Sequence, residues 1–333
     1  MKKTKKTFSI ILMLCILCLC AFSVGAVNAK DDIIKYAEFN VTYEALSKAA
    51  ELDIESHGTD TELNCVELLA FLGAKYGGDF SKYKSADMLS VADRLKSGEK
   101  MSDITADMKY YNYYFEVYNA VLGEFIGNFS EGTQSETVYG LKVFSPIAAT
   151  FPYSDFDDFG ASRSYGYKRL HLGHDLMAAT GTPVIAIESG TVECLGWNQY
   201  GGWRIGIRSF DKKRYYYYAH LRQNRPYHAD LETGAVVAAG DVIGYVGRTG
   251  YSAEENTNGI EVSHLHLGLQ LIFDESQKEC DNEIWVDLYA ITKLLQRHKS
   301  EVYRVAQTKE FYRKAAFFEK NLPQGSTQKI PSP

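Results

Sequence analysis

Apolar residues recur at three- and four-residue intervals through the N-terminal third of the chain. This spacing puts them on one face of a helix and predicts amphipathic helices. Gly58, the Gly77-Gly78 pair and Gly98 fall between the segments, where glycine commonly ends a helix. We therefore predict a small all-α domain over residues 30–130. Its helices are expected at Val41–Ile54, Glu62–Tyr76, Ala86–Lys96 and Ile104–Ile126.

After Val138 the pattern changes to short runs rich in β-branched and aromatic residues, separated by Gly, Asn or Asp. Such runs, spaced by about 8–12 residues, are typical of an antiparallel β-sandwich or barrel, which we predict over residues 138–280. The polar stretch Asn128–Glu136 is expected to link the two domains. Strands are expected at Thr182–Ile187, Thr191–Trp197, Trp203–Ser209, Arg214–Leu221, Ala235–Ala238, Val242–Gly247 and His264–Phe273.

From Trp285 to Lys320 the apolar spacing is helical again, so residues 281–320 are predicted to form a C-terminal helical extension. Residues 321–333 contain three prolines and no apolar periodicity, and we expect a disordered tail there. The predicted fold class is α+β and multidomain: a small all-α N-terminal domain, then an antiparallel β-sandwich or barrel-like domain with a C-terminal helix.

Residues 1–29 have the composition of a secretory signal peptide. Four lysines precede an apolar run from Phe8 to Phe22, and the small residues Ala26 and Ala29 offer cleavage sites before Lys30. The alternative is an uncleaved segment in which residues 8–27 anchor the protein in a membrane, because the run is close to the length of a span. The expected location is therefore secreted, or membrane-anchored and extracytoplasmic.

Charge and cysteine content exclude two classes of function. Loss of residues 1–29 removes four lysines and no acid, which takes the formal charge from −6 to −10. An acidic protein does not bind nucleic acid through bulk charge, so no nucleic-acid partner is expected. Cys65, Cys194 and Cys280 then remain, without a C-x-x-C spacing, and are expected to be thiols rather than a disulfide framework or a metal site.

Five of the eight histidines lie in three short segments, which are Leu170–Leu176, Tyr218–Leu221 and Ser263–Leu267. Imidazole and carboxylate groups are good zinc donors, and three protein ligands with an open fourth position make a catalytic zinc site. On a strand from His264 to Phe273, His264 and His266 share one face at about 7 Å, while the alternate leucines fill the core. One histidine could then bind a metal while the other reaches a group at that metal. The alternative is a pair of exposed histidines on a polar strand face.

His171 and Asp175 are four residues apart, a separation of about 13 Å along an extended strand and too far for one metal. A bend at Gly173 would bring them together, with His171 before it and Asp175 on the strand after it. His174 is an alternative donor, although its side chain is expected to point away from Asp175.

These segments resemble the lysostaphin-type, or LytM-domain, zinc endopeptidases of bacterial peptidoglycan. The resemblance covers roughly Phe159 to Gln270 and rests on several ordered motifs. They are Phe159-Gly160-Ala161-Ser162-Arg163, Arg169-Leu170-His171-Leu172-Gly173-His174-Asp175-Leu176, Gly181-Thr182-Pro183-Val184, Ser189-Gly190-Thr191-Val192, Tyr218-Ala219-His220-Leu221, Gly240–Gly250 and His264-Leu265-His266.

The resemblance implies that His171, Asp175 and His266 bind Zn²⁺ and that His220 and His264 are the catalytic pair beside a zinc-activated water. It implies a metalloendopeptidase that hydrolyses peptide bonds of peptidoglycan, so the expected partners are peptidoglycan peptides and the expected compartment is the extracellular cell wall. The alternative is a non-catalytic surface scaffold that binds the wall or a partner protein through the same cleft.

The chain departs from the family pattern around its last motif. Ser263 stands where the family often has proline, and Leu267-Gly268 replaces a common Phe-Glu. An insertion, Tyr251 to Val262, precedes His264. These changes leave the implied ligands intact and reshape one wall of the groove, where they would affect substrate preference.

Overall fold

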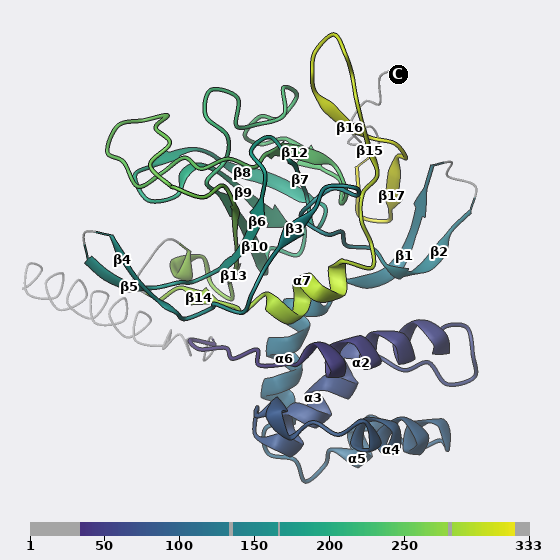
Figure 1. Cartoon of the computed structure of the whole chain (residues 1–333). Helices are drawn as coiled ribbons and strands as arrows, with labels where there is room; N and C mark the ends of the chain where they lie inside the picture. Colours follow the sequence, from purple (N-terminus) through teal and green to yellow (C-terminus); the bar gives the residue numbers. More distant parts are fainter. Residues whose placement is uncertain (1–33, 133–135, 166, 279–281, 324–333) are drawn as a thin grey trace, which may run out of the picture. The chain divides into compact units, whose positions relative to one another are not determined.

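The structure is a computed structural model that describes residues 34–132, 136–165, 167–278 and 282–323 (Figure 1). The signal segment expected at 1–29, Cys280 and most of the tail expected at 321–333 lie outside these ranges. The described residues from Tyr36 onward form one compact unit. Among the described residues, no helix is both long and apolar enough to cross a membrane.

The helical character of the N-terminal region is confirmed. Its helices are α2 (Tyr43–Ser56), α3 (Cys65–Tyr76), α4 (Ser85–Lys96), α5 (Met101–Ile104) and α6 (Tyr111–Leu122). Side chains of Thr42 and Asn64 cap α2 and α3 at their N-termini, and Gly77 ends α3 in the left-handed conformation. The single helix expected over 104–126 is wrong. The Thr105 hydroxyl donates to the Met101 carbonyl, and a series of tight turns separates α5 from α6.

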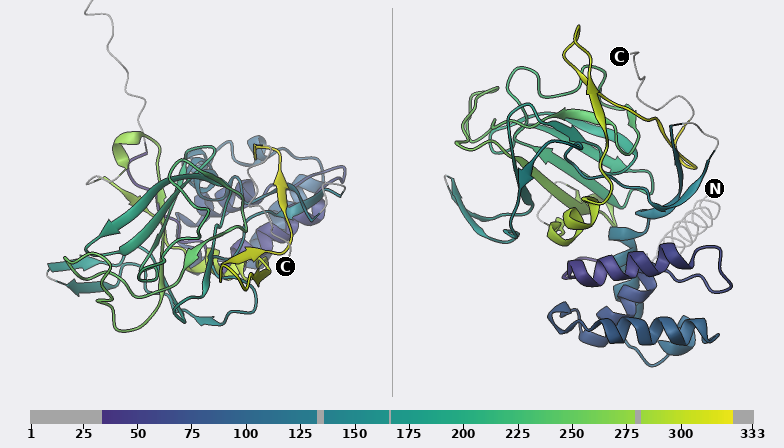
Figure 2. Two further views of the ribbon diagram at one scale, coloured as in Figure 1. Left: turned by 90° about the horizontal axis from the view of Figure 1, so that it is seen from above. Right: turned by 45° about the vertical axis from the view of Figure 1, so that its right-hand side comes forward.

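The β-region is built on an antiparallel eight-stranded sheet with the order β11-β8-β9-β10-β13-β6-β3, in which β14 also pairs with β13 (Figures 1 and 2). These strands are β3 (Tyr153–Ser154), β6 (His174–Ala178), β8 (Gly190–Asn198), β9 (Gly202–Ser209), β10 (Arg214–Ala219), β11 (Val236–Val237), β13 (Leu265–Leu271) and β14 (Ile284–Trp285). A separate pair joins β7 (Pro183–Ile185) to β12 (Val242–Tyr245).

The register of β13 positions the histidine segments. His266 lies opposite Ala219 of β10 on one side and opposite Asp175 of β6 on the other. The alternation expected along β13 is confirmed, because Leu265, Leu267, Leu269 and Leu271 are all fully buried. The leucines therefore fix which face of β13 carries His266.

The expected linker and C-terminal extension are both corrected. Residues 126–141 form a hairpin of β1 (Ile126–Glu131) and β2 (Val138–Leu141), and β17 (Phe317–Glu319) adds to it. Among residues 282–320, which the structure describes, only α7 (Tyr289–Leu295) is an α-helix, and β15 (Val302–Arg304) pairs with β16 (Phe311–Arg313) beyond it. The reason is tertiary. Phe129, Phe144 and Phe317 pack in one buried cluster. This packing stabilises strand pairing relative to a helix.

Buried polar bonds join the helical and β-regions. The Arg214 guanidinium on β10 donates to the Ala120 carbonyl of α6 at 2.7 Å. The Tyr139 hydroxyl on β2 donates to Asp53 of α2 at 2.8 Å, and α2 packs on α7.

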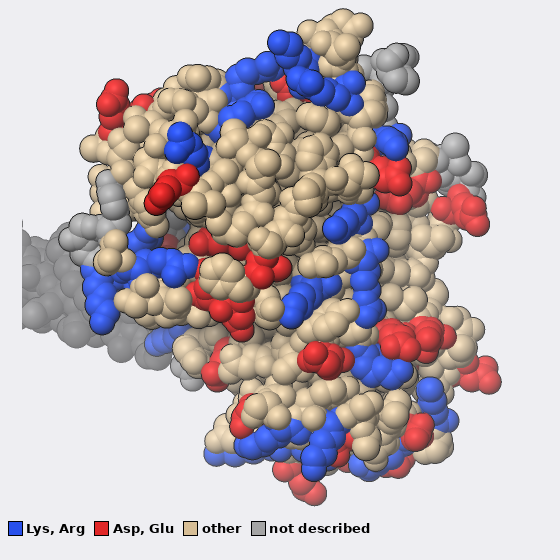
Figure 3. Space-filling model, viewed as in Figure 1, with Lys and Arg blue, Asp and Glu red and all other residues tan. Residues whose placement is uncertain are grey.

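On the face shown in Figure 3, acidic and basic side chains are interspersed. Cys65 and Cys194 are free thiols, as expected.

Candidate metal centre

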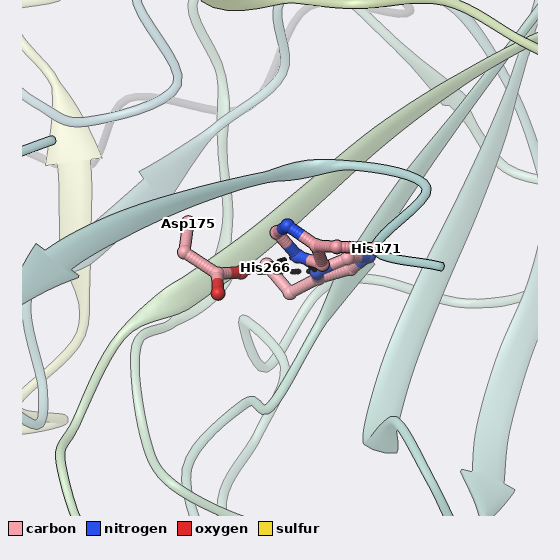
Figure 4. A group of neighbouring side chains, drawn as sticks. All are labelled: His171, Asp175 and His266. Atoms are coloured by element: carbon pink, nitrogen blue, oxygen red, sulfur yellow. Dashed lines mark hydrogen bonds and ion pairs between the residues drawn. The ribbon is translucent and has the colours of Figure 1, made fainter. Parts of the chain in front are cut away.

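His171, Asp175 and His266 meet at one point (Figure 4). His171 follows β5 (Tyr167–Leu170), and the chain bends at Gly173 before Asp175 enters β6. The His171 Nε2 atom lies 3.1 Å from Asp175 Oδ1 and 2.9 Å from His266 Nδ1, and the last two atoms are 3.0 Å apart. A Cβ on Gly173 would lie 2.5 Å from the His266 ring, so only glycine fits at this bend.

The three donors suit a zinc ion in number, type and spacing. Ligand atoms around a tetrahedral zinc ion, with bonds of about 2.0–2.2 Å, lie roughly 3.3–3.6 Å apart. The observed triangle has sides of 2.9–3.1 Å, so each donor needs to move by only a few tenths of an ångström. Two imidazoles and one carboxylate also form the donor set of known catalytic zinc sites.

Asp158 orients the first of these histidines. The His171 Nδ1 atom lies 3.1 Å from an Asp158 carboxylate oxygen and 3.2 Å from the Asp158 carbonyl oxygen, both of which can only accept a hydrogen bond. The proton therefore resides on Nδ1, and the Nε2 lone pair faces Asp175 and His266. Arg163 in turn donates to the Asp158 carboxylate. Asp158 could not be recognised as a site residue from the sequence, where its sole signal is its place just before Phe159.

His220 and His264 approach the same point from β10 and from the start of β13. Their ring centroids are 4.8 Å apart, and the His220 ring is 5.7 Å from that of His266. The Nδ1 atom of His220 donates to the Thr249 carbonyl at 2.9 Å, and that of His264 donates to the Val262 carbonyl at 2.8 Å. Both bonds leave Nε2 unprotonated in the neutral ring, and the His264 Nε2 is 3.8 Å from Asp175 Oδ1.

The surroundings favour the protonation state that metal binding needs. Burial alone would raise the pKa of Asp175, but its contacts with the imidazoles of His171 and His266 outweigh burial and hold the pKa well below its usual range. Burial lowers the pKa of His266, although Asp175 opposes the change. Burial and the neighbouring His264 also lower the pKa of His220 well below its usual value. The carboxylate is thus ionised and these two imidazoles are neutral near pH 7.

The five residues line one open cleft of about 100 Å³. All five site residues named from the sequence are therefore brought together. The alternative donor His174 is not, because it is 1% exposed and its Nε2 contacts Asp155 at 2.9 Å. No site role was assigned from the sequence to the other side chains that line the cleft, which are Arg163, Arg169, Tyr200, Tyr217 and Tyr251.

Residues 169–279 match peptidase family M23. The L-Ala–D-Glu endopeptidase of Bacillus subtilis is 40% identical over 124 residues, which are 37% of this chain and 36% of that protein. Lysostaphin of Staphylococcus staphylolyticus is 39% identical over 99 residues, 29% of this chain and 18% of that protein. The matched segment thus spans about a third or less of these relatives.

The fold is also similar to a crystal structure described as a candidate glycyl-glycine endopeptidase lytM from Ruminococcus gnavus. The TM-score is 0.53 and the identity 25%, over 80% of this chain and 92% of that one.

Proposed function

We propose that the chain is a zinc metalloendopeptidase that hydrolyses peptide bonds of bacterial peptidoglycan. The proposal is supported by the match of residues 169–279 to peptidase family M23 and by the similarity to L-Ala–D-Glu endopeptidase, lysostaphin and a LytM-type structure. The observation that carries the proposal is the meeting of five residues in one cleft, three as a donor triangle and two with free Nε2 atoms beside it. A wall-binding scaffold would not need the second pair.

His171, Asp175 and His266 would hold the ion. When bound, zinc supplies Lewis acidity and lowers the pKa of a water molecule to about 7. His220 and His264 would transfer protons beside the three metal-binding side chains. The Nδ1 proton of each ring is held by a backbone carbonyl, so Nε2 is the atom that accepts a proton from the attacking water and later delivers it to the leaving amine.

We place the enzyme outside the cytoplasm, in the cell-wall compartment, on the basis of the signal-like residues 1–29. Whether residues 8–27 stay as an anchor is tested by the size of the mature protein. The names of its relatives suggest two kinds of target, an L-Ala–D-Glu bond and a glycyl-glycine bond.

The test combines zinc content, the loss of turbidity of a cell-wall suspension and mass spectrometry of the released peptides. The parent should contain about one zinc per chain and lower the turbidity. His264→Ala should keep zinc and lose most turnover. His57→Ala, which alters the residue directly after α2 and outside the cleft, is the matched control and should behave as the parent. A parent that binds zinc but releases no new peptide ends would refute the enzyme in favour of the scaffold.

A further inference from the structure

Arg169 is a cation in the wall of the cleft that has no acidic partner in the part of the chain that the structure describes. It lies near the end of β5, and no carboxylate among the described residues comes within 4.0 Å of it, whereas Arg163 beside it is paired with Asp158. The Arg169 guanidinium donates to the Tyr251 hydroxyl at 2.6 Å and lies 5.3 Å and 5.6 Å from the ring centroids of Tyr251 and Tyr200. Its Nε is buried without a hydrogen-bond partner among the described residues.

The charged side chains that line the cleft are mainly basic, whereas the chain as a whole is acidic. The chain carries a formal charge of −6, yet among the described residues Asp175 is the only acid that lines the cleft, and two histidines contact it. Arg163 is compensated by Asp158 and lies 3.6 Å from Asp175. Arg169 is therefore the cleft's uncompensated charge, and a charge of one sign in a recessed site concentrates ligands of the other sign.

We propose that Arg169 forms a carboxylate subsite, and that the preferred substrate is a peptide with a free carboxylate close to the scissile bond rather than a neutral glycine bridge. This rests on the proposed function. A guanidinium matches a carboxylate with two parallel hydrogen bonds, and aromatic rings at its faces hold the planar group in place. Here the rings of Tyr200 and Tyr251 take that position.

Tyr251 lies between the proposed subsite and the catalytic histidines. Its ring centroid is 5.8 Å from that of His220 and 5.3 Å from the Arg169 guanidinium, so a peptide that contacts His220 can also place a carboxylate at Arg169. Tyr251 opens the insertion that distinguishes this chain, and its backbone has φ 49°, which is uncommon for a residue other than glycine. The Tyr251 hydroxyl now accepts the hydrogen bond that a substrate carboxylate oxygen would take over.

The test uses two peptides that contain an L-Ala–D-Glu bond and differ only in having the free carboxylate or its carboxamide beside that bond. For the parent, kcat/KM should be at least about tenfold higher with the carboxylate, since a hydrogen bond to a charged group is worth at least that factor. Arg169→Gln should lose this advantage, because glutamine cannot make the two parallel charged hydrogen bonds to a carboxylate. Arg94→Gln, which alters an exposed arginine of α4, is the matched control and should keep the preference.

Binding of the same peptides is measured in the His264→Ala background, with and without Arg169→Gln, so that the subsite is tested without turnover. A carboxylate preference that disappears with Arg169→Gln supports the subsite. Equal effects of Arg169→Gln on both peptides, or no preference in the parent, would overturn it while leaving the enzyme proposal intact. If neither peptide is cut and no wall peptide is released, the proposed function fails, and the binding comparison still decides the subsite.

Discussion

Replacing Glu188 by glutamine should destabilise the protein by about 3–5 kcal/mol. Glu188 accepts two hydrogen bonds from the Arg214 guanidinium, at 2.8 and 3.0 Å, and a third from the Tyr216 hydroxyl at 2.7 Å. The side chain of Arg214 is fully buried and that of Glu188 is 8% exposed. Burial opposes the charge on Arg214, but Glu188 raises the pKa of Arg214 above its usual value.

The magnitude follows from what the substitution leaves behind. Glutamine removes the charge and turns one acceptor into a donor that faces other donors, so a buried guanidinium loses most of its compensation. Asp211 still contacts Arg214 at 2.9 Å, so the expected cost lies at the lower end of this range, at about 3 kcal/mol. That is a large part of the roughly 5–15 kcal/mol by which domains are stable.

Glu275→Gln is the matched control. Glu275 contacts the buried Arg208 at 2.5 Å, but its own side chain is 70% exposed, so its loss should cost below about 1 kcal/mol. Unfolding of the parent and both variants in urea is followed by circular dichroism. The shift of each midpoint, with the same dependence of free energy on urea concentration for all three proteins, gives the loss of unfolding free energy in each variant. If the two variants unfold at the same urea concentration, burial does not set the strength of the Glu188 contact and the reasoning is wrong.

Four further outcomes are expected. His266→Ala should lose bound zinc because one of three donors is gone, and full zinc retention would show that the proposed ligand set is wrong. Asp158→Asn should weaken zinc binding about 10–100-fold in chelator competition, because it weakens the hydrogen bond that orients the His171 ring. Unchanged affinity would show that Asp158 does not orient His171. Burial lowers the pKa of His228, so the unfolded chain takes up a proton below about pH 6.5 that the folded chain does not, and stability falls as pH drops, by up to about 1.4 kcal/mol per unit. His228→Gln should flatten this slope between pH 6.5 and 5, and equal slopes would contradict the assignment. The fragment 138–333 should unfold at lower urea than the mature chain because it lacks the contacts with α2 and α6, and an equal midpoint would show that the β-region folds independently.

Local pattern was sufficient for several parts of the site. Leucines at every second position of β13 determine that His264 and His266 share the other face. Gly173 between His171 and Asp175 predicted the bend that brings these two side chains together, and the structure has it. Each of these inferences involves residues within a few positions of one another, where backbone geometry alone sets direction.

The sequence did not predict the features that depend on distant partners. Phe317 pairs with Glu131 and packs on Phe129, so the C-terminal segment forms strands where its own spacing favoured a helix. The contact of Asp158 with His171, and the absence of any described acid within 4.0 Å of Arg169, likewise depend on how separate strands and loops are placed. Sequence periodicity thus determined which side chains share a face of a strand. Only the tertiary structure decided which faces meet, because strand pairing and burial join residues whose separation along the chain leaves no periodic signal.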